Sequence, residues 1–133
     1  MPDKVLPKVL ESINFVSPDI VELRYLPSAN VSFGDMREIL NHLYAFTQNK
    51  RLKRLIVISK DAQMELPARL LLQQENKDRK DTIIAEAVLV TSLTQKMTTN
   101  FYLKFIKDSY PSRFFTDYEK AIEWLNAQED NQI

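Results

Sequence analysis

The chain has 133 residues, in which 18 lysines and arginines balance 18 aspartates and glutamates, so its formal net charge is zero. Proteins that bind nucleic-acid backbones usually carry an excess of cations, and the balanced charge therefore argues against nucleic acid as the main partner. The length and a hydrophobic content of 44% predict a single folded domain over residues 1–133, with its core at about 11–126.

Cysteine is absent from the sequence, which excludes disulfides, a thiolate nucleophile and thiolate metal ligands. The N-terminal segment lacks the continuous apolar stretch of a signal peptide. No run approaches the roughly 20 apolar residues that span a bilayer. We therefore expect a cytoplasmic protein without integral membrane association.

Two short runs of alternating apolar and polar residues open the domain, from Glu11 to Val16 and from Ile20 to Leu26. Between them, Ser17-Pro18-Asp19 supplies turn chemistry, because proline fixes φ and aspartate bonds nearby backbone amides. The pattern predicts an antiparallel hairpin with Ile13 and Phe15 on one face.

After Pro27 the period of the sequence changes. Apolar residues from Met36 to Phe46 recur at three- and four-residue steps, which predicts a helix that ends near Asn49. We expect the basic run from Lys50 to Arg54 to be a solubilising loop, with a binding patch as the alternative. The apolar run from Leu55 to Ile58 predicts a strand that is buried on both faces.

A second helix is predicted to begin at Pro67, because the missing N–H of proline is harmless in the first turn of a helix. It is expected to end within the charged stretch from Glu75 to Asp81. The apolar run from Ile83 to Val90 then predicts another buried strand.

A capping box from Ser92 to Gln95 predicts a third helix. Apolar side chains recur on it at four-residue steps, and core packing is the default interpretation of that spacing. In the alternative, part of this helix lines an apolar cleft or a partner surface, with a lysine nearby to meet an anionic group. The candidate ligand or partner residues on this helix are Met97, Phe101, Tyr102, Lys104 and Phe105.

The chain closes with a short strand from Arg113 to Phe115 and a second capping box from Thr116 to Glu119. The final helix is expected to bury Tyr118 and Leu125. The complete order, β-β-α-β-α-β-α-β-α, predicts an α/β fold with a mixed sheet of about five strands, an N-terminal hairpin and four helices.

Residues that carry chemistry are few. Glycine occurs once, at Gly34, so the glycine-rich loops that cradle phosphates are excluded. His42 is the single histidine, and we expect it to be solvated on the first helix rather than to act as a general base. This residue set disfavours a zinc site. We therefore expect no enzymatic activity, no cofactor and no metal; a hydrolase would need His42 in a cleft beside a serine and an acid.

The ending from Arg113 to Leu125, with a phenylalanine pair, an acidic stretch and then Ala121-x-x-Trp124-Leu125, resembles the SpoIIAA-like branch of the STAS superfamily. The segment from Ala87 to Ser92, followed by Asn100 to Tyr102, resembles a small bacterial group of uncharacterised members of that branch. The match in element order spans roughly residues 11 to 126.

The resemblance implies a STAS (SpoIIAA-like) sandwich that is not an enzyme. Relatives include antagonists of anti-sigma factors, which a phosphorylated serine switches, and apolar-ligand carriers of the Sec14 type. The phosphorylated serine of those relatives lies in an Asp-Ser-Gly-like turn. The corresponding loop here, Ile58 to Ala62, contains no glycine. Ser59 is therefore not assigned as a phosphorylation switch.

We expect a regulatory or protein-interaction module whose partner is unidentified. The expected contact surface is the second helix and the loop before it, Lys60 to Arg69, with Asp61 and Arg69 as candidate contacts. The alternative is a carrier of an apolar small molecule or lipid. A homodimer formed through an edge strand of the hairpin is also open.

Overall fold

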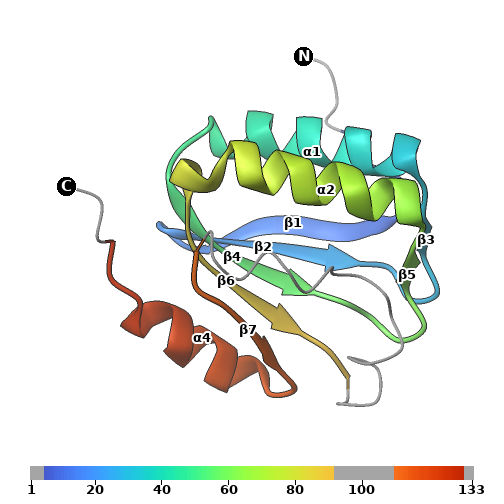
Figure 1. The fold of residues 1–133 in the computed structure, drawn as a ribbon. Helices are drawn as coiled ribbons and strands as arrows, with labels where there is room; N and C mark the ends of the chain where they lie inside the picture. The colour runs from blue at the N-terminus through green and yellow to red at the C-terminus, as the bar shows by residue number, and fades with distance from the viewer. Residues whose placement is uncertain (1–4, 92–109, 131–133) are drawn as a thin grey trace.

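The computed structural model describes residues 5–91 and 110–130. One five-stranded sheet has the order β1-β2-β4-β6-β7, with α1 and α2 on one face and α4 on the other (Figure 1). The strands of this sheet are β1 (Leu10–Ser17), β2 (Ile20–Tyr25), β4 (Leu52–Val57), β6 (Ile83–Leu89) and β7 (Ser112–Phe115). The helices are α1 (Phe33–Thr47), α2 (Leu66–Asp78) and α4 (Tyr118–Ala127), and a short 3-10 turn, η1 (Lys80–Thr82), follows α2.

The predicted hairpin and the predicted mixed sheet are both confirmed. β1 pairs antiparallel with β2, with Ile13 opposite Leu23 and Phe15 opposite Val21. β2, β4, β6 and β7 pair in parallel, as the alternation of strands and helices requires. The third predicted helix, with Ser92 to Gln95 at its start, lies outside the described residues.

The core has two layers, one on each face of the sheet. The larger layer packs β1, β2, β4 and β6 against α1 and α2, and Met36 and Ile39 of α1 are almost fully buried in it. The smaller layer lies under α4, where Leu55 of β4 and Leu125 of α4 are both fully buried. Each such side chain stabilises the fold by about 1.5–3 kcal/mol relative to an exposed one.

The helix starts are capped in ways that only partly follow the sequence pattern. Ser32 and Asp35 form a reciprocal capping box at α1, with N···O distances of 3.0 and 3.1 Å. At α4 the cap is Asp117, which accepts hydrogen bonds from Glu119 and Lys120, rather than the expected Thr116. An aspartate directly before the helix can reach these amides with its short carboxylate.

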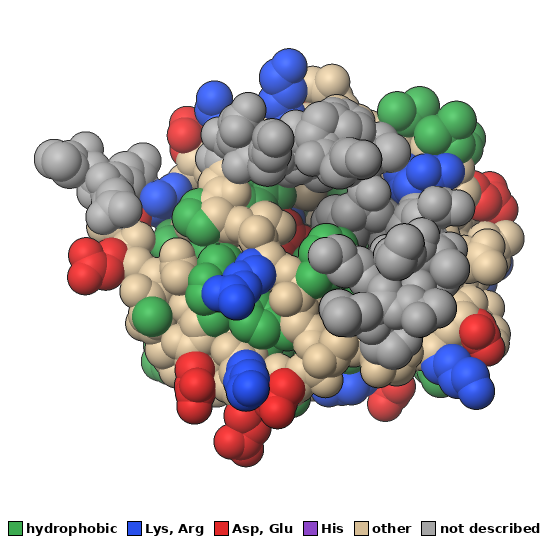
Figure 2. Space-filling model, turned by 60° about the horizontal axis from the view of Figure 1, so that its bottom comes forward, with side chains coloured by type: hydrophobic (Ala, Val, Ile, Leu, Met, Phe, Trp, Pro, Cys, Tyr) green, Lys and Arg blue, Asp and Glu red, His purple; other side chains and the backbone are tan. Residues whose placement is uncertain are grey.

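Tyr118, expected to be buried, is 38% exposed, and its hydroxyl donates to Glu22 on β2 at 2.8 Å. Figure 2 shows the molecule from the side that carries α4, where apolar side chains lie among acidic and basic ones. The polar tip of the tyrosine is thus satisfied at the rim of the α4 layer.

The basic run from Lys50 to Arg54 is not the solubilising loop that we expected. β4 begins at Leu52, so Lys53 and Arg54 lie inside the strand and are only 6% and 8% exposed. Each has a polar partner: Lys53 Nζ lies 3.4 Å from Asp19, and Arg54 donates to Asn76 at 3.0 Å. Burial of these cations is tolerated because they are paired.

A second, two-stranded sheet was not predicted. β3 (Asn30–Val31) and β5 (Gln63–Met64) pair in parallel, and a single residue separates each of them from the helix that follows. This small sheet joins the loop after β2 to the loop after β4.

Candidate functional site

The β3–β5 pairing brings the starts of α1 and α2 together at one end of the molecule. Gln63 donates its backbone N–H to Ala29 at 2.7 Å, and Glu65 donates to Val31 at 2.9 Å. A third backbone bond, from Ser28 to the carbonyl of Lys60 at 2.8 Å, closes the end of the two loops. Because Val31 pairs with Met64, the first residues of the two helices fall at matching positions.

Three large apolar side chains are exposed at this end. Phe33 and Leu66, the first residues of α1 and α2, are 43% and 51% exposed, and Leu70, one turn further along α2, is 51% exposed. We call these three residues the helix-start patch. A cluster of exposed apolar side chains on a rigid frame is typical of a surface that another molecule covers.

Polar contacts flank the helix-start patch and fix its frame. Asn30 donates from its side-chain amide to the carboxylate of Glu65 at 3.1 Å, which joins the ends of the two loops. Exposed polar groups beside an apolar centre are the usual anatomy of a protein interface.

Asp61 and Arg69, the two candidate contacts predicted before and within α2, lie on either side of Leu66 in the sequence, whereas Phe33 of the patch lies on α1. Asp61 is exposed and has a left-handed backbone with φ of 62°. Arg69 is half-buried, and its Nε donates to the carbonyl of Met64 at 3.2 Å. The guanidinium of Arg69 therefore ties α2 to the end of β5, while the carboxylate of Asp61 is open to solvent.

The other five candidate residues, Met97, Phe101, Tyr102, Lys104 and Phe105, lie outside the described residues. Their assignment to a ligand or partner surface stays a prediction.

Ser59 follows β4 and is half-buried. Its hydroxyl donates a short hydrogen bond to the backbone carbonyl of Tyr25, at the end of β2. The side chain thus links the two parallel strands at the point where the loops to the candidate site begin.

His42 lies on α1, on the side of the molecule that carries β1. It is half-buried and borders a shallow groove with Phe46 of the same helix and Ile13 of β1; Leu6, Ser12 and Asn14 complete the lining. The lining contains no acid, and Ser12 is its single hydroxyl. The arrangement of this groove therefore does not supply the histidine–acid pair that a hydrolase would need.

The sequence analysis did not predict a network of buried polar side chains that lies inside the core. Arg54 and Glu86 are neighbours on β4 and β6, and both are at most 8% exposed. Arg54 donates to Asn76 of α2, while Tyr110 donates to Glu86 at 3.0 Å. Burial, and then the charge of Glu86, raise the pKa of the Tyr110 phenol well above its ordinary value. The sequence held one signal for this network: Arg54 and Glu86 are charged residues within two largely apolar strands, and charged residues are buried only with polar partners.

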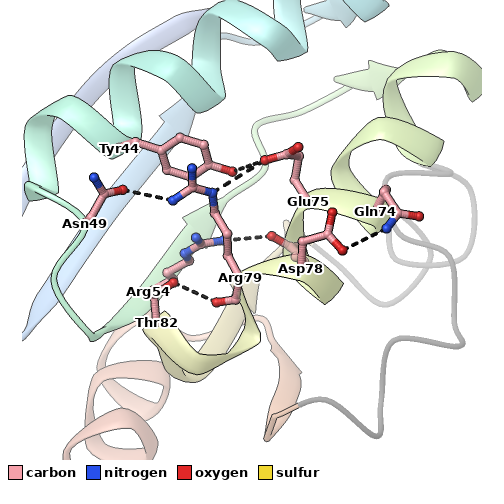
Figure 3. A network of polar contacts seen from close by, with 9 residues as sticks. Tyr44, Asn49, Arg54, Gln74, Glu75, Asp78, Arg79 and Thr82 are labelled. Carbon is pink, nitrogen blue, oxygen red and sulfur yellow. Dashed lines mark hydrogen bonds and ion pairs between the residues drawn. The ribbon is translucent and has the colours of Figure 1, made fainter.

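A second polar network joins the far ends of α1 and α2, as Figure 3 shows. Arg79 lies over the ring of Tyr44, 3.6 Å from its centroid, and donates to Asn49 at 2.9 Å. Tyr44 donates to Glu75 at 2.8 Å, and Arg79 Nε lies 3.5 Å from the same carboxylate. Burial, and then the hydrogen bond to Glu75, raise the pKa of Tyr44.

The crevice beside this network has a volume of about 10 Å³, which is room for about one water. Its lining includes Arg54 and Arg79. We interpret the network of Tyr44, Glu75 and Arg79 as structural, because its polar groups contact one another beside a space no larger than about one water.

Within residues 5–91 and 110–130, no group of three or more His, Cys, Asp or Glu side chains is placed to hold a metal ion. No helix in these two ranges is long and apolar enough to cross a membrane.

Comparison with known proteins places the fold. No curated protein matches the sequence. A solved structure from Shewanella loihica PV-4, an uncharacterised protein of the DUF3478 family with a SpoIIAA-like fold, matches with a TM-score of 0.59 and 14% sequence identity. The match covers 86% of this chain and 90% of that one. The expected SpoIIAA-like fold is therefore confirmed.

A family model covers most of the same region. It matches residues 15–129, which include the hairpin turn, both loops of the helix-start patch and α4. The chain belongs to the family described as Domain of unknown function (DUF7793).

Proposed function

We propose that this SpoIIAA-like domain is a non-enzymatic interaction module that binds a protein partner through the start of α2 and the loop before it. The observation that carries the proposal is the helix-start patch, in which Phe33, Leu66 and Leu70 are 43–51% exposed at the adjoining starts of two helices. Apolar side chains of this size are costly to leave in water unless a partner covers them.

The chemistry of the partner follows from the surface. An apolar centre flanked by the carboxylates of Asp61 and Glu65 suits a partner that presents one or two apolar anchors beside a basic residue. Arg69 is expected to act indirectly, because its Nε already donates to Met64 and positions the helix.

The test is affinity enrichment from the native cells with three forms of the immobilised chain. The wild type is compared with a Leu66→Ser, Leu70→Ser double variant, which removes two anchors that are exposed and therefore not needed for folding. A Val5→Ser variant is the matched control, since Val5 is 79% exposed and lies outside the patch. Circular dichroism should show the same fold for all three.

The expected result is a protein that is retained by the wild type and by Val5→Ser and is lost with the double variant. The purified pair should then show a dissociation constant at least about tenfold weaker for the double variant, which corresponds to about 1.4 kcal/mol. A partner that binds the double variant with unchanged affinity would exclude this surface.

The carrier alternative, in which the domain holds an apolar small molecule or lipid, rests on the residues around Phe101 and Tyr102. Native mass spectrometry of freshly purified protein tests it directly. A mass that exceeds the chain and falls to the chain mass after solvent extraction would support a carrier. The bare chain mass, together with no gain on incubation with fatty acid, would exclude it.

A further inference from the structure

β1 is a long edge strand whose protection against pairing, within the described residues, is limited to one charge and two irregular positions in its register. It has eight residues, carries a single charge at Glu11 and contains no proline. Edge strands normally avoid pairing with other chains through charges, prolines or short length. The opposite edge, β7, shows such devices: it has four residues, includes Arg113 and follows Pro111.

Apolar surface continues from the β1 edge onto α1. Phe15 is 42% exposed and stacks on Phe46 with ring centroids 5.1 Å apart, and Val16 is 39% exposed. The groove bordered by His42, Phe46 and Ile13 runs along the same edge and has a volume of about 380 Å³. The edge therefore combines a long strand, which pairs on one side only within the described residues, with an apolar groove beside it.

We propose that this β1 edge binds a second copy of the chain, so that the two sheets continue into one across a two-fold axis. In an antiparallel pair, hydrogen-bonded and non-hydrogen-bonded positions alternate, so a two-fold axis must pass through a residue that faces its own copy. Ile13 and Asn14 are the two residues at the middle of β1, within its regular stretch between two irregular positions.

The charge pattern of β1 fits a copy of itself in either central register. With the axis at Ile13, Glu11 faces Phe15 of the second copy, and with the axis at Asn14 it faces Ser17. Glu11 faces its own copy in neither register, so no like charges meet along the strand. An axis perpendicular to the sheet also keeps α1 of both copies on the same face. The two grooves then adjoin and close over Phe15 and Phe46.

The pairing is tested with the full chain by native mass spectrometry and by light scattering on a size-exclusion column, over a series of concentrations. The wild type is expected to have twice the mass of the chain at high concentration and to dissociate on dilution. Asn14→Lys places two lysines directly opposite each other with the axis at Asn14, and at diagonal positions with the axis at Ile13. In both registers we expect its dimer dissociation constant to rise at least about tenfold. Ser112→Lys, on the exposed start of β7, should leave the dimer unchanged.

A cross-link provides a second readout, because the chain contains no cysteine of its own. Under mild oxidation, Asn14→Cys should form a disulfide-linked dimer with the axis at Asn14, and Ile13→Cys with the axis at Ile13, since facing side chains in adjacent strands have Cβ atoms about 4.5–5.5 Å apart. Ser112→Cys should stay largely unlinked. A wild type that is monomeric at about 100 µM, or a dimer that Asn14→Lys does not weaken, would overturn the proposal. These variants leave the helix-start patch unchanged, so partner binding and self-association can fail separately.

Discussion

The single glycine of the chain and its left-handed residues occupy different positions. Gly34 lies in the first turn of α1, and a Cβ at this position would meet only the Ser32 hydroxyl at 3.9 Å. Four non-glycine residues, Ser28, Gln48, Asn49 and Asp61, instead have φ between 56° and 62°. A side chain other than asparagine or aspartate costs about 1 kcal/mol in this conformation.

Gln48 gives the clearest test of this cost. It ends α1 with φ of 56°, is exposed, and its N–H already bonds the last turn of the helix. Gln48→Gly should therefore raise the free energy of unfolding by about 0.5–1 kcal/mol, measured by urea denaturation. Ala45→Gly, an exposed position inside the same helix, is the control and should lower it by about 1 kcal/mol. A change in the free energy of unfolding that has the same sign for both variants would contradict this explanation.

At the scale of elements, α2 is attached to the sheet through a polar contact inside an apolar layer. Asn76 is 1% exposed and accepts from Arg54 of β4, and its side-chain nitrogen has no hydrogen-bond partner in the described part of the chain. The amide thus serves Arg54, because a buried guanidinium without an acceptor is more costly than one unpaired amide N–H.

This reasoning predicts the result of a double-mutant cycle. Asn76→Ala should destabilise the protein by about 1–3 kcal/mol, since it leaves the buried Arg54 without this acceptor. In a chain that already carries Arg54→Met, the same change should cost clearly less. Urea denaturation of the four proteins gives the coupling energy. Strictly additive losses would show that the contact between the two side chains is not what stabilises this junction.

Local pattern was enough to predict the elements whose burial follows a simple period. The hairpin, α1 and the parallel order of the later strands are examples, because alternation and four-residue steps directly state which face is buried. The predicted start of β4, at Leu55, was wrong for a physical reason: the strand begins at Leu52. Lys53 and Arg54 can be buried only because Asp19 and Asn76 meet them, and those partners are far away in the sequence.

The candidate site stays a prediction. The sequence named the segment from Lys60 to Arg69, which contains Leu66 of the helix-start patch but neither Phe33 nor Leu70. The exposure of Leu66 and Leu70 could not be predicted, because leucines near the start of a helix normally indicate core contact. β3 and β5 are two residues long, too short for any periodic signal.

At the scale of the whole molecule, buried tyrosines limit stability at high pH. Burial and the nearby charge of Glu86 raise the pKa of both Tyr25 and Tyr110 above the ordinary value of 10.0. Above pH 10 the unfolded chain therefore loses these protons while the folded chain keeps them. Stability is fully present below pH 10 and falls as the pH rises, by up to about 1.4 kcal/mol per pH unit for each tyrosine.

The contribution of one tyrosine can be isolated. Tyr110→Phe removes one of these protons and the hydrogen bond to Glu86, so it should lower stability at pH 7 by about 1–2 kcal/mol and also make the decline above pH 10 less steep. Urea midpoints at pH 7, 10 and 11 measure both effects. An alkaline slope identical to that of the wild type would mean that Tyr110 ionises as readily in the folded protein as in the unfolded one.

The small β3–β5 sheet has a consequence for how the domain meets another molecule. It fastens α1 and α2 at their starts, and the network of Tyr44, Glu75 and Arg79 fastens them at their ends. The helix pair is thus held at both extremities before any encounter. When a partner binds both helices, little conformational entropy is lost in ordering them. Association should therefore proceed nearly as between rigid bodies, with preorganisation in place of induced fit.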